Sequence, residues 1–161
     1  MNADSSHSSP QSPDSIPSAP ATGTIIAFDF GEKRIGIAIG DLAVRIAHPL
    51  TTIRAEDNAR RFAEIQNLMR EWKPVRLIVG LPMYADGTEH NLSHLARRFA
   101  RRLEGRFNIP VTLVDERLTS RSAETRLKES GLQPERVNDA LDAAAAREIL
   151  EAFFCESPDR T

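Results

Sequence analysis

Several kinds of residue are scarce in this chain of 161 residues. It has a single cysteine, Cys155, so no disulfide can form within the chain, which favours a reducing, cytoplasmic location. Aromatic residues make up only 6% of the chain, so stacking on unpaired nucleic-acid bases is not indicated. No apolar run approaches the ~20 residues that a membrane-spanning helix needs, and no membrane association is expected.

The first 23 residues differ in composition from the rest. They are rich in Ser and Pro, and their only charged side chains are Asp4 and Asp14. They have neither the basic start and apolar centre of a secretory signal nor the arginines of a transit peptide. We therefore expect a disordered tail over residues 1–23, one domain over 24–155 and a flexible C-terminus over 156–161.

Neither sign of charge dominates the expected domain. Apart from Asp4, Asp14, Asp159 and Arg160, which lie near the two ends, the chain has 20 basic and 20 acidic residues. Such a balance argues against a surface covered in positive potential. Any binding of nucleic acid would have to come from a local basic patch.

The apolar pattern predicts an α/β fold with a mixed five-stranded sheet flanked by helices. Residues 24–30 and 34–40 are expected to form a hairpin, followed by a third antiparallel strand within 44–53, where Pro49 favours an edge position. Alternating helices and strands then follow, which predicts parallel strands. They are expected at 58–72 (helix), 75–80 (strand), up to about 104 (helix), 109–116 (strand), 120–131 (helix) and 138–154 (helix).

Acidic residues stand at the ends of two expected strands. Asp29 ends the first strand, and Asp115 and Glu116 end the strand 109–116. Ligands of open α/β sheets gather at the carboxyl ends of parallel strands. If these two strands are parallel neighbours, their terminal acids meet at one edge of the sheet.

A third acid is placed by helical periodicity. Asp142 should point inward near the start of its helix, with Asp139 close by, because it shares a helix face with apolar residues that should pack on the sheet. These apolar residues are Ala146, Ile149 and Phe153.

Two explanations of these acids remain open. Converging carboxylates repel one another, and Mg²⁺ or Mn²⁺, which prefer oxygen ligands, would relieve that repulsion and support phosphoryl chemistry. Alternatively, each acid has a local structural role: Asp29 caps a turn, Glu116 pairs with Arg117 or Lys33, and Asp142 complements the helix dipole.

Four separated motifs resemble those of the YqgF family, also called RuvX, within the RNase H-like superfamily. They are "IIAFDFGEKRIGIAIGD", "LIVGLPMYADGTEHN", "VDERLTSRSAE" and "DALDAAAAREILEAFF", in the family's order between about Thr24 and Phe154. The resemblance implies an RNase H-like fold and a nuclease with an acidic metal site. Its catalytic and metal-binding acids would be Asp29, Glu116 and Asp142, holding Mg²⁺ or Mn²⁺.

The resemblance also implies a function. The expectation is a metal-dependent endonuclease that acts in maturation of ribosomal RNA, at the 5′ end of the pre-16S precursor. A Holliday-junction-resolvase-like DNA nuclease and a non-catalytic nucleic-acid-binding module are the alternatives. Nucleic acid is the expected partner, and a homodimer stays open.

Basic residues near the acids are candidate substrate contacts. Lys33 and Arg34 follow the first strand, and Arg117 and Thr119 follow Glu116. A second candidate patch is an arginine arc on the helix that ends near residue 104, where a solvated helix face is the alternative. The arc consists of Arg97, Arg98, Arg101 and Arg102, of which Arg97 and Arg101 are taken as nucleic-acid contacts.

Two other site types are weighed and set aside. His90 and His94 have the i, i+4 spacing of a zinc pair, but no third ligand is apparent from the sequence. The stretch "DFGEKRIGIAIG" also resembles the phosphate loop of actin-like and sugar kinases. Those proteins close two such domains over ATP, and one domain of this size cannot form that cleft.

Overall fold

The first half of the sheet consists of three antiparallel strands, β1 (Thr24–Phe30), β2 (Arg34–Asp41) and β3 (Ala47–Arg54). The computed structural model of the protein describes residues 22–118 and 134–156. The expected tail lies almost wholly outside these described residues, as do the expected helix 120–131 and residues 157–161. Within them, no helix has both the length and the apolar character needed to cross a membrane.

The second half of the sheet is parallel. Helix α1 (Asn58–Trp72) leads to β4 (Arg76–Leu81), and α2 (Asn91–Phe107) leads to β5 (Val111–Asp115). β4 pairs in parallel with β1 and β5 with β4, giving the strand order β3-β2-β1-β4-β5. The predicted mixed five-stranded sheet is confirmed, and Pro49 lies on the edge strand β3, where its missing N–H is tolerated.

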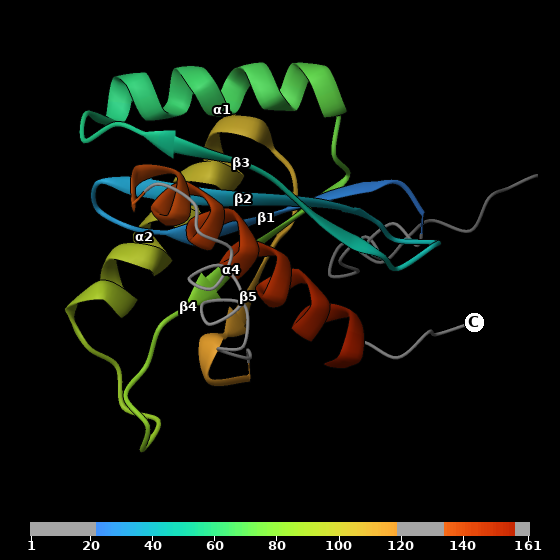
Figure 1. Ribbon diagram of the computed structural model, residues 1–161. Helices are drawn as coiled ribbons and strands as arrows, with labels where there is room; N and C mark the ends of the chain where they lie inside the picture. The colour runs from blue at the N-terminus through green and yellow to red at the C-terminus, as the bar shows by residue number, and fades with distance from the viewer. Residues whose placement is uncertain (1–21, 119–133, 157–161) are drawn as a thin grey trace, which may run out of the picture.

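The two faces of the sheet are covered by different helices (Figure 1). Alternate residues of β1 point to opposite faces. Ile26 and Phe28 belong to the core formed with α1 and α2, whereas Ile25 and Ala27 pack against α4 (Pro134–Glu156). Asp29 continues the second set, so its side chain lies on the α4 face.

Helices α1 and α2 both begin at the carboxyl edge of the parallel strands. Asp57 caps α1 by accepting the backbone N–H of Arg60. His90 caps α2 by accepting the N–H of Leu92, while the Ser93 side chain accepts the N–H of His90. The N-termini of both helices therefore lie at the edge where Asp29 is found.

Helix α4 begins at Pro134, one turn earlier than the predicted start at residue 138. Proline is well tolerated in the first helical turn, where its missing N–H leaves no hydrogen bond unmade. The prediction that Asp142 lies near the start of the helix was therefore wrong. Asp142 lies two turns inside the helix, beyond the first turn in which a helix dipole favours acids.

Candidate active site

Asp29 lies between two residues that have no side chain. Its partner across β2 is Gly36, and on the other side Gly80 follows Val79, the β4 partner of Phe28. A Cβ atom on Gly36 would stand 1.9 Å from the backbone oxygen of Asp142, and one on Gly80 would stand 2.6 Å from Oε1 of Glu116. The two glycines thus leave the space beside Asp29 that α4 and Glu116 occupy.

Sequence reasoning did not single out these glycines as site residues. The available signal was their position inside apolar strands, "RIGIAIG" and "LIVG". Glycine weakens a strand and commonly marks a place where another backbone or group comes close. Here it is α4 and the Glu116 side chain that approach.

Asp29 and Glu116 share a hydrogen bond between their carboxyl groups. Burial is the main cause that raises the pKa of Asp29 well above its ordinary value, and the charges of Glu116 and Asp142 raise it further. Burial also raises the pKa of Glu116, although the hydrogen bond to Asp29 opposes that rise. Burial and the neighbouring charges therefore favour the protonated form of Asp29.

Asp142 completes the group from α4. Burial raises its pKa, and Arg34 opposes the rise by donating from Nε to Oδ2 of Asp142 over 2.7 Å. Arg34 is the first residue of β2, so this ion pair ties the β1–β2 turn to α4. The structure thus brings together the three acids that the sequence selected.

Asp115 and Asp139 each have an arginine of their own. Arg117 donates to both carboxylate oxygens of Asp115, with the shortest contact at 2.6 Å, and this pairing lowers the pKa of Asp115. Arg54 donates to Asp139 over 2.7 Å. Both carboxylates thus have an ion-pair partner of their own, although the charge of Asp115 still raises the pKa of Glu116 and that of Asp139 still raises the pKa of Asp142.

The alternative of purely local roles agrees poorly with this geometry. Arg117 pairs with Asp115 rather than with Glu116. Asp142 lies beyond the first turn of its helix, and the carboxyl of Asp29 is hydrogen-bonded to another acid, Glu116. The described contacts therefore favour a common role for the three carboxyls.

The donor set suits a divalent cation. Mg²⁺ and Mn²⁺ prefer carboxylate oxygens, and a cation would relieve the repulsion that raises the pKa of Asp29. The acids do not yet form a closed ligand set: across residues 22–118 and 134–156, no three Asp, Glu, His or Cys side chains are already grouped to hold an ion. The Asp142 carboxylate faces Arg34 instead, so an ion would have to share or replace that partner.

The predicted substrate contacts are placed as follows. Lys33 is exposed in the β1–β2 turn, and Arg117 has most of its donors on Asp115. Arg97 makes a two-point ion pair with Glu89, whereas Arg101 is exposed. Thr119 lies outside the described residues, so its predicted contact stays a prediction, as do the others.

A hollow of about 620 Å³ lies directly beside Glu116, between the loop after β4 and the start of α2. His90 lines it, and a positive charge on its ring would oppose the rise in the pKa of Glu116. The His90 ring also lies 4.8 Å from that of Tyr84, which is 57% exposed. An exposed ring pair therefore lies close to the acids, which the low aromatic content did not indicate. Nδ1 of His90 accepts the N–H of Leu92 in the cap of α2.

The sheet order and the flanking helices define an RNase H-like fold of the RuvC type. The chain is similar to a solved structure of T. thermophilus RuvC in complex with a Holliday junction substrate, with a TM-score of 0.51. The two are 14% identical, and the similarity covers 83% of this chain and 95% of that one. At this identity the similarity establishes the fold alone.

Within that class, the chain belongs to the RuvX family. The family model described as "RuvX: Holliday junction resolvase" matches residues 23–156. A relative from Methylobacillus flagellatus is 55% identical over 86% of this chain and 94% of its own length. A second, from Dechloromonas aromatica, is 55% identical over 84% of this chain and 92% of its own, and both carry the name "Putative pre-16S rRNA nuclease".

Proposed function

We propose that this protein is a divalent-metal-dependent endonuclease that hydrolyses phosphodiester bonds in precursor ribosomal RNA, at the 5′ end of pre-16S rRNA. The observation that carries the proposal is the group of Asp29, Glu116 and Asp142, in which burial and mutual repulsion raise the pKa of Asp29. The name of the two relatives supports the choice of substrate. The cytoplasm is the proposed location.

The three acids would hold the ion through their carboxylate oxygens. Mg²⁺ or Mn²⁺, when bound, activates water and stabilises charge on a reacting phosphate. Both carboxyls must be ionised for their oxygens to act as ligands, so the raised pKa of Asp29 opposes ion binding at low pH. Arg34, which neutralises Asp142, is placed to turn its guanidinium to a substrate phosphate, and Lys33 is exposed in the same turn.

No side chain is needed as a covalent nucleophile in this proposal. The chain's own contribution is to fix three carboxylates at one edge of the sheet, through β1, the end of β5 and α4. Preorganised charge at the reacting phosphate is the main means by which such sites lower the barrier.

A second candidate function is cleavage of branched DNA. The description of the matching family model, which includes Holliday junction resolvase, favours it. The same acids would serve either substrate, because the chemistry at phosphorus is the same. A non-catalytic nucleic-acid-binding protein is the third alternative, and it predicts binding without cleavage.

The experiment that separates these functions uses two substrates. Purified protein is incubated with end-labelled precursor 16S rRNA and with a four-way DNA junction, each with Mg²⁺, Mn²⁺ or EDTA. We expect metal-dependent cleavage of the RNA near its 5′ end. Cleavage of the junction alone supports the second function, and binding without cleavage of either substrate contradicts both nucleases.

A further inference from the structure

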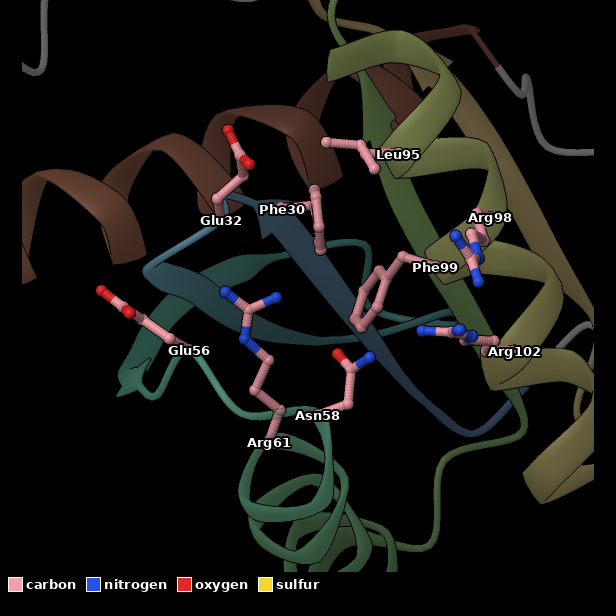
Figure 2. Close-up of a pocket in the computed structure, with 9 residues that line it drawn as sticks. All are labelled: Phe30, Glu32, Glu56, Asn58, Arg61, Leu95, Arg98, Phe99 and Arg102. Atoms are coloured by element: carbon pink, nitrogen blue, oxygen red, sulfur yellow. The ribbon is translucent and has the colours of Figure 1, made fainter. Parts of the chain in front are cut away.

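A groove runs between α1 and α2, on the face of the sheet opposite α4. Two adjoining hollows of about 240 and 340 Å³ form it, and both are lined by Asn58 of α1 and Arg102 of α2. One end is bordered by Phe30, the residue after Asp29, and by Glu32 (Figure 2). This α1–α2 groove therefore begins at the edge of the sheet that carries the three acids.

The α2 side of the groove is a row of arginines. Arg98 and Arg102 line the first hollow, and Arg102 and Arg106 line the second. Residues four apart in a helix lie ~6 Å apart along its axis on nearly the same face. This spacing is similar to that of successive phosphates along an extended nucleic-acid strand.

The arginines of α2 differ in how they are neutralised. Among the described residues, neither Arg98 nor Arg102 makes a hydrogen bond or an ion pair. Arg106 stacks on Phe62, with its guanidinium carbon 4.3 Å from the ring centre. Arg97, on the other side of the helix, is paired with Glu89. The cations available to a ligand in the groove are therefore Arg98 and Arg102.

The α1 side of the groove contributes Arg61, whose guanidinium already has hydrogen-bond partners. Arg61 is buried, and it donates to the backbone oxygens of Ala55 and Gly31. The charges of Glu32 and Glu56 act on it. Figure 2 shows these two acids across the groove from Arg98 and Arg102, so the positive side of the groove is α2.

We propose that the α1–α2 groove guides the RNA strand away from the catalytic acids, with its phosphates along Arg98 and Arg102. This inference rests on the proposed nuclease function and names a contact surface for its substrate. Glu32 and Glu56 repel phosphates from the opposite side and thereby direct the strand to α2. The row differs from Arg97 and Arg101, the pair selected from the sequence.

The test measures binding of a single-stranded RNA oligonucleotide as a function of salt, with EDTA present to prevent cleavage. The variant of interest is Arg98→Gln/Arg102→Gln. A matched control, Arg60→Gln/Arg70→Gln, removes the same charge from exposed positions of α1 that do not line the groove. Arg97→Gln/Arg101→Gln tests the rival surface, and thermal melting confirms that each variant is folded.

We expect the Arg98/Arg102 variant to flatten the dependence of log affinity on log salt by ~0.7 for each phosphate that the protein no longer neutralises. The control pair should keep the slope of the unmodified protein. Removing one repulsive charge with Glu56→Gln should tighten binding, which a merely structural groove would not do.

Three results would contradict the proposal that the groove binds the RNA strand. The slope of the Arg98/Arg102 variant stays unchanged, as it would if the groove received a protein segment instead; the α1 control flattens it equally; or only Arg97/Arg101 flattens it. Cleavage of precursor rRNA with Mn²⁺ is measured separately. If cleavage persists while the groove variants bind RNA normally, the proposed RNA contact in the groove is refuted and the proposed nuclease function stands.

Discussion

At the scale of single residues, Asp29 is the residue on which burial and repulsion combine. It lies on the face of β1 that packs against α4, and its carboxyl is hydrogen-bonded to that of Glu116. Nearby Arg34 supplies the cation for Asp142 only. The site therefore has one carboxylate in an ion pair, Asp142, and one hydrogen-bonded pair of carboxyls, Asp29 and Glu116. A bound cation would alter both arrangements.

The contribution of Asp29 to the stability of the metal-free protein should become unfavourable as the pH rises above about 4. Below the ordinary pKa of a free Asp, ~3.9, the folded and unfolded chains both hold the Asp29 proton. Above it, the unfolded chain releases this proton while the folded chain keeps it up to the raised pKa. The folded state then binds more protons, so the free energy of unfolding falls with rising pH.

Asp29→Asn is the matched variant for this pH dependence. The amide stays neutral at all pH values, so the decline in stability should be shallower than in the unmodified protein. Urea unfolding at a series of pH values with EDTA measures both slopes. Equal slopes would show that Asp29 ionises normally in the folded protein.

Arg34→Gln should separate metal binding from cleavage. Without the guanidinium, Asp142 loses the cation that is hydrogen-bonded to it, so the affinity for Mn²⁺ should rise. The partly exposed ion pair contributes about 1 kcal/mol or less to folding, so the variant should remain folded. Cleavage should nevertheless slow, because the guanidinium can no longer hold the substrate phosphate; titration calorimetry and a cleavage assay measure the two effects. Weaker Mn²⁺ binding would argue against competition at Asp142.

At the scale of elements, the site depends on how closely α4 approaches β2. Gly36 permits that approach, because a Cβ atom there would overlap the backbone of Asp142. Three elements meet at this point: β1 carries Asp29, the end of β5 leads to Glu116, and α4 carries Asp142. Displacement of α4 would therefore separate the acids without altering any of them.

Gly36→Ala should push α4 away from β2, because the added Cβ atom would meet backbone of α4 that cannot easily move aside. We expect cleavage to fall strongly and the free energy of unfolding to fall by a few kcal/mol. Gly105→Ala is the control. Gly105 is exposed within α2 with nothing near its missing Cβ, so alanine there should be neutral or stabilising by up to ~1 kcal/mol. Normal cleavage by Gly36→Ala would show that the close approach is not required.

Much of the element structure is accessible from periodicity. Residues 24–30 and 58–72 have the bounds that the sequence predicts, because their apolar patterns are regular and their ends are marked by charged or capping residues. The predicted start of α4 is a turn too late because proline usually interrupts a helix, although Pro134 is favourable in a first turn.

At the scale of the whole molecule, the convergence of Asp29, Glu116 and Asp142 was predictable from strand ends, helix phase and family resemblance. The pairing of Arg34 with Asp142 was not, because it joins residues 108 apart through the registers of β2 and α4. The α1–α2 groove was not predictable from the sequence either. The sequence shows an arc of four arginines, and only packing against α1 distinguishes Arg98 and Arg102 from Arg97.

The fold also separates two tasks by face. The acids lie on the α4 face of the sheet, and the proposed strand-guiding arginines lie beyond the other face, with both regions meeting at the carboxyl edge of β1. Changes in the groove should accordingly alter binding with little effect on the acids. Changes at the acids should abolish chemistry with little effect on binding.

The most direct test of the central claim is the cleavage rate of Asp29→Asn on precursor 16S rRNA with Mn²⁺, together with its melting temperature in EDTA. The removal of one ligand should slow cleavage roughly a hundredfold or more, since a bound metal supplies several kcal/mol and each ~1.4 kcal/mol is tenfold in rate. Relief of repulsion should leave the melting temperature unchanged or higher. Cleavage at the unmodified rate, or a large fall in melting temperature with activity retained, would contradict a catalytic metal site at Asp29.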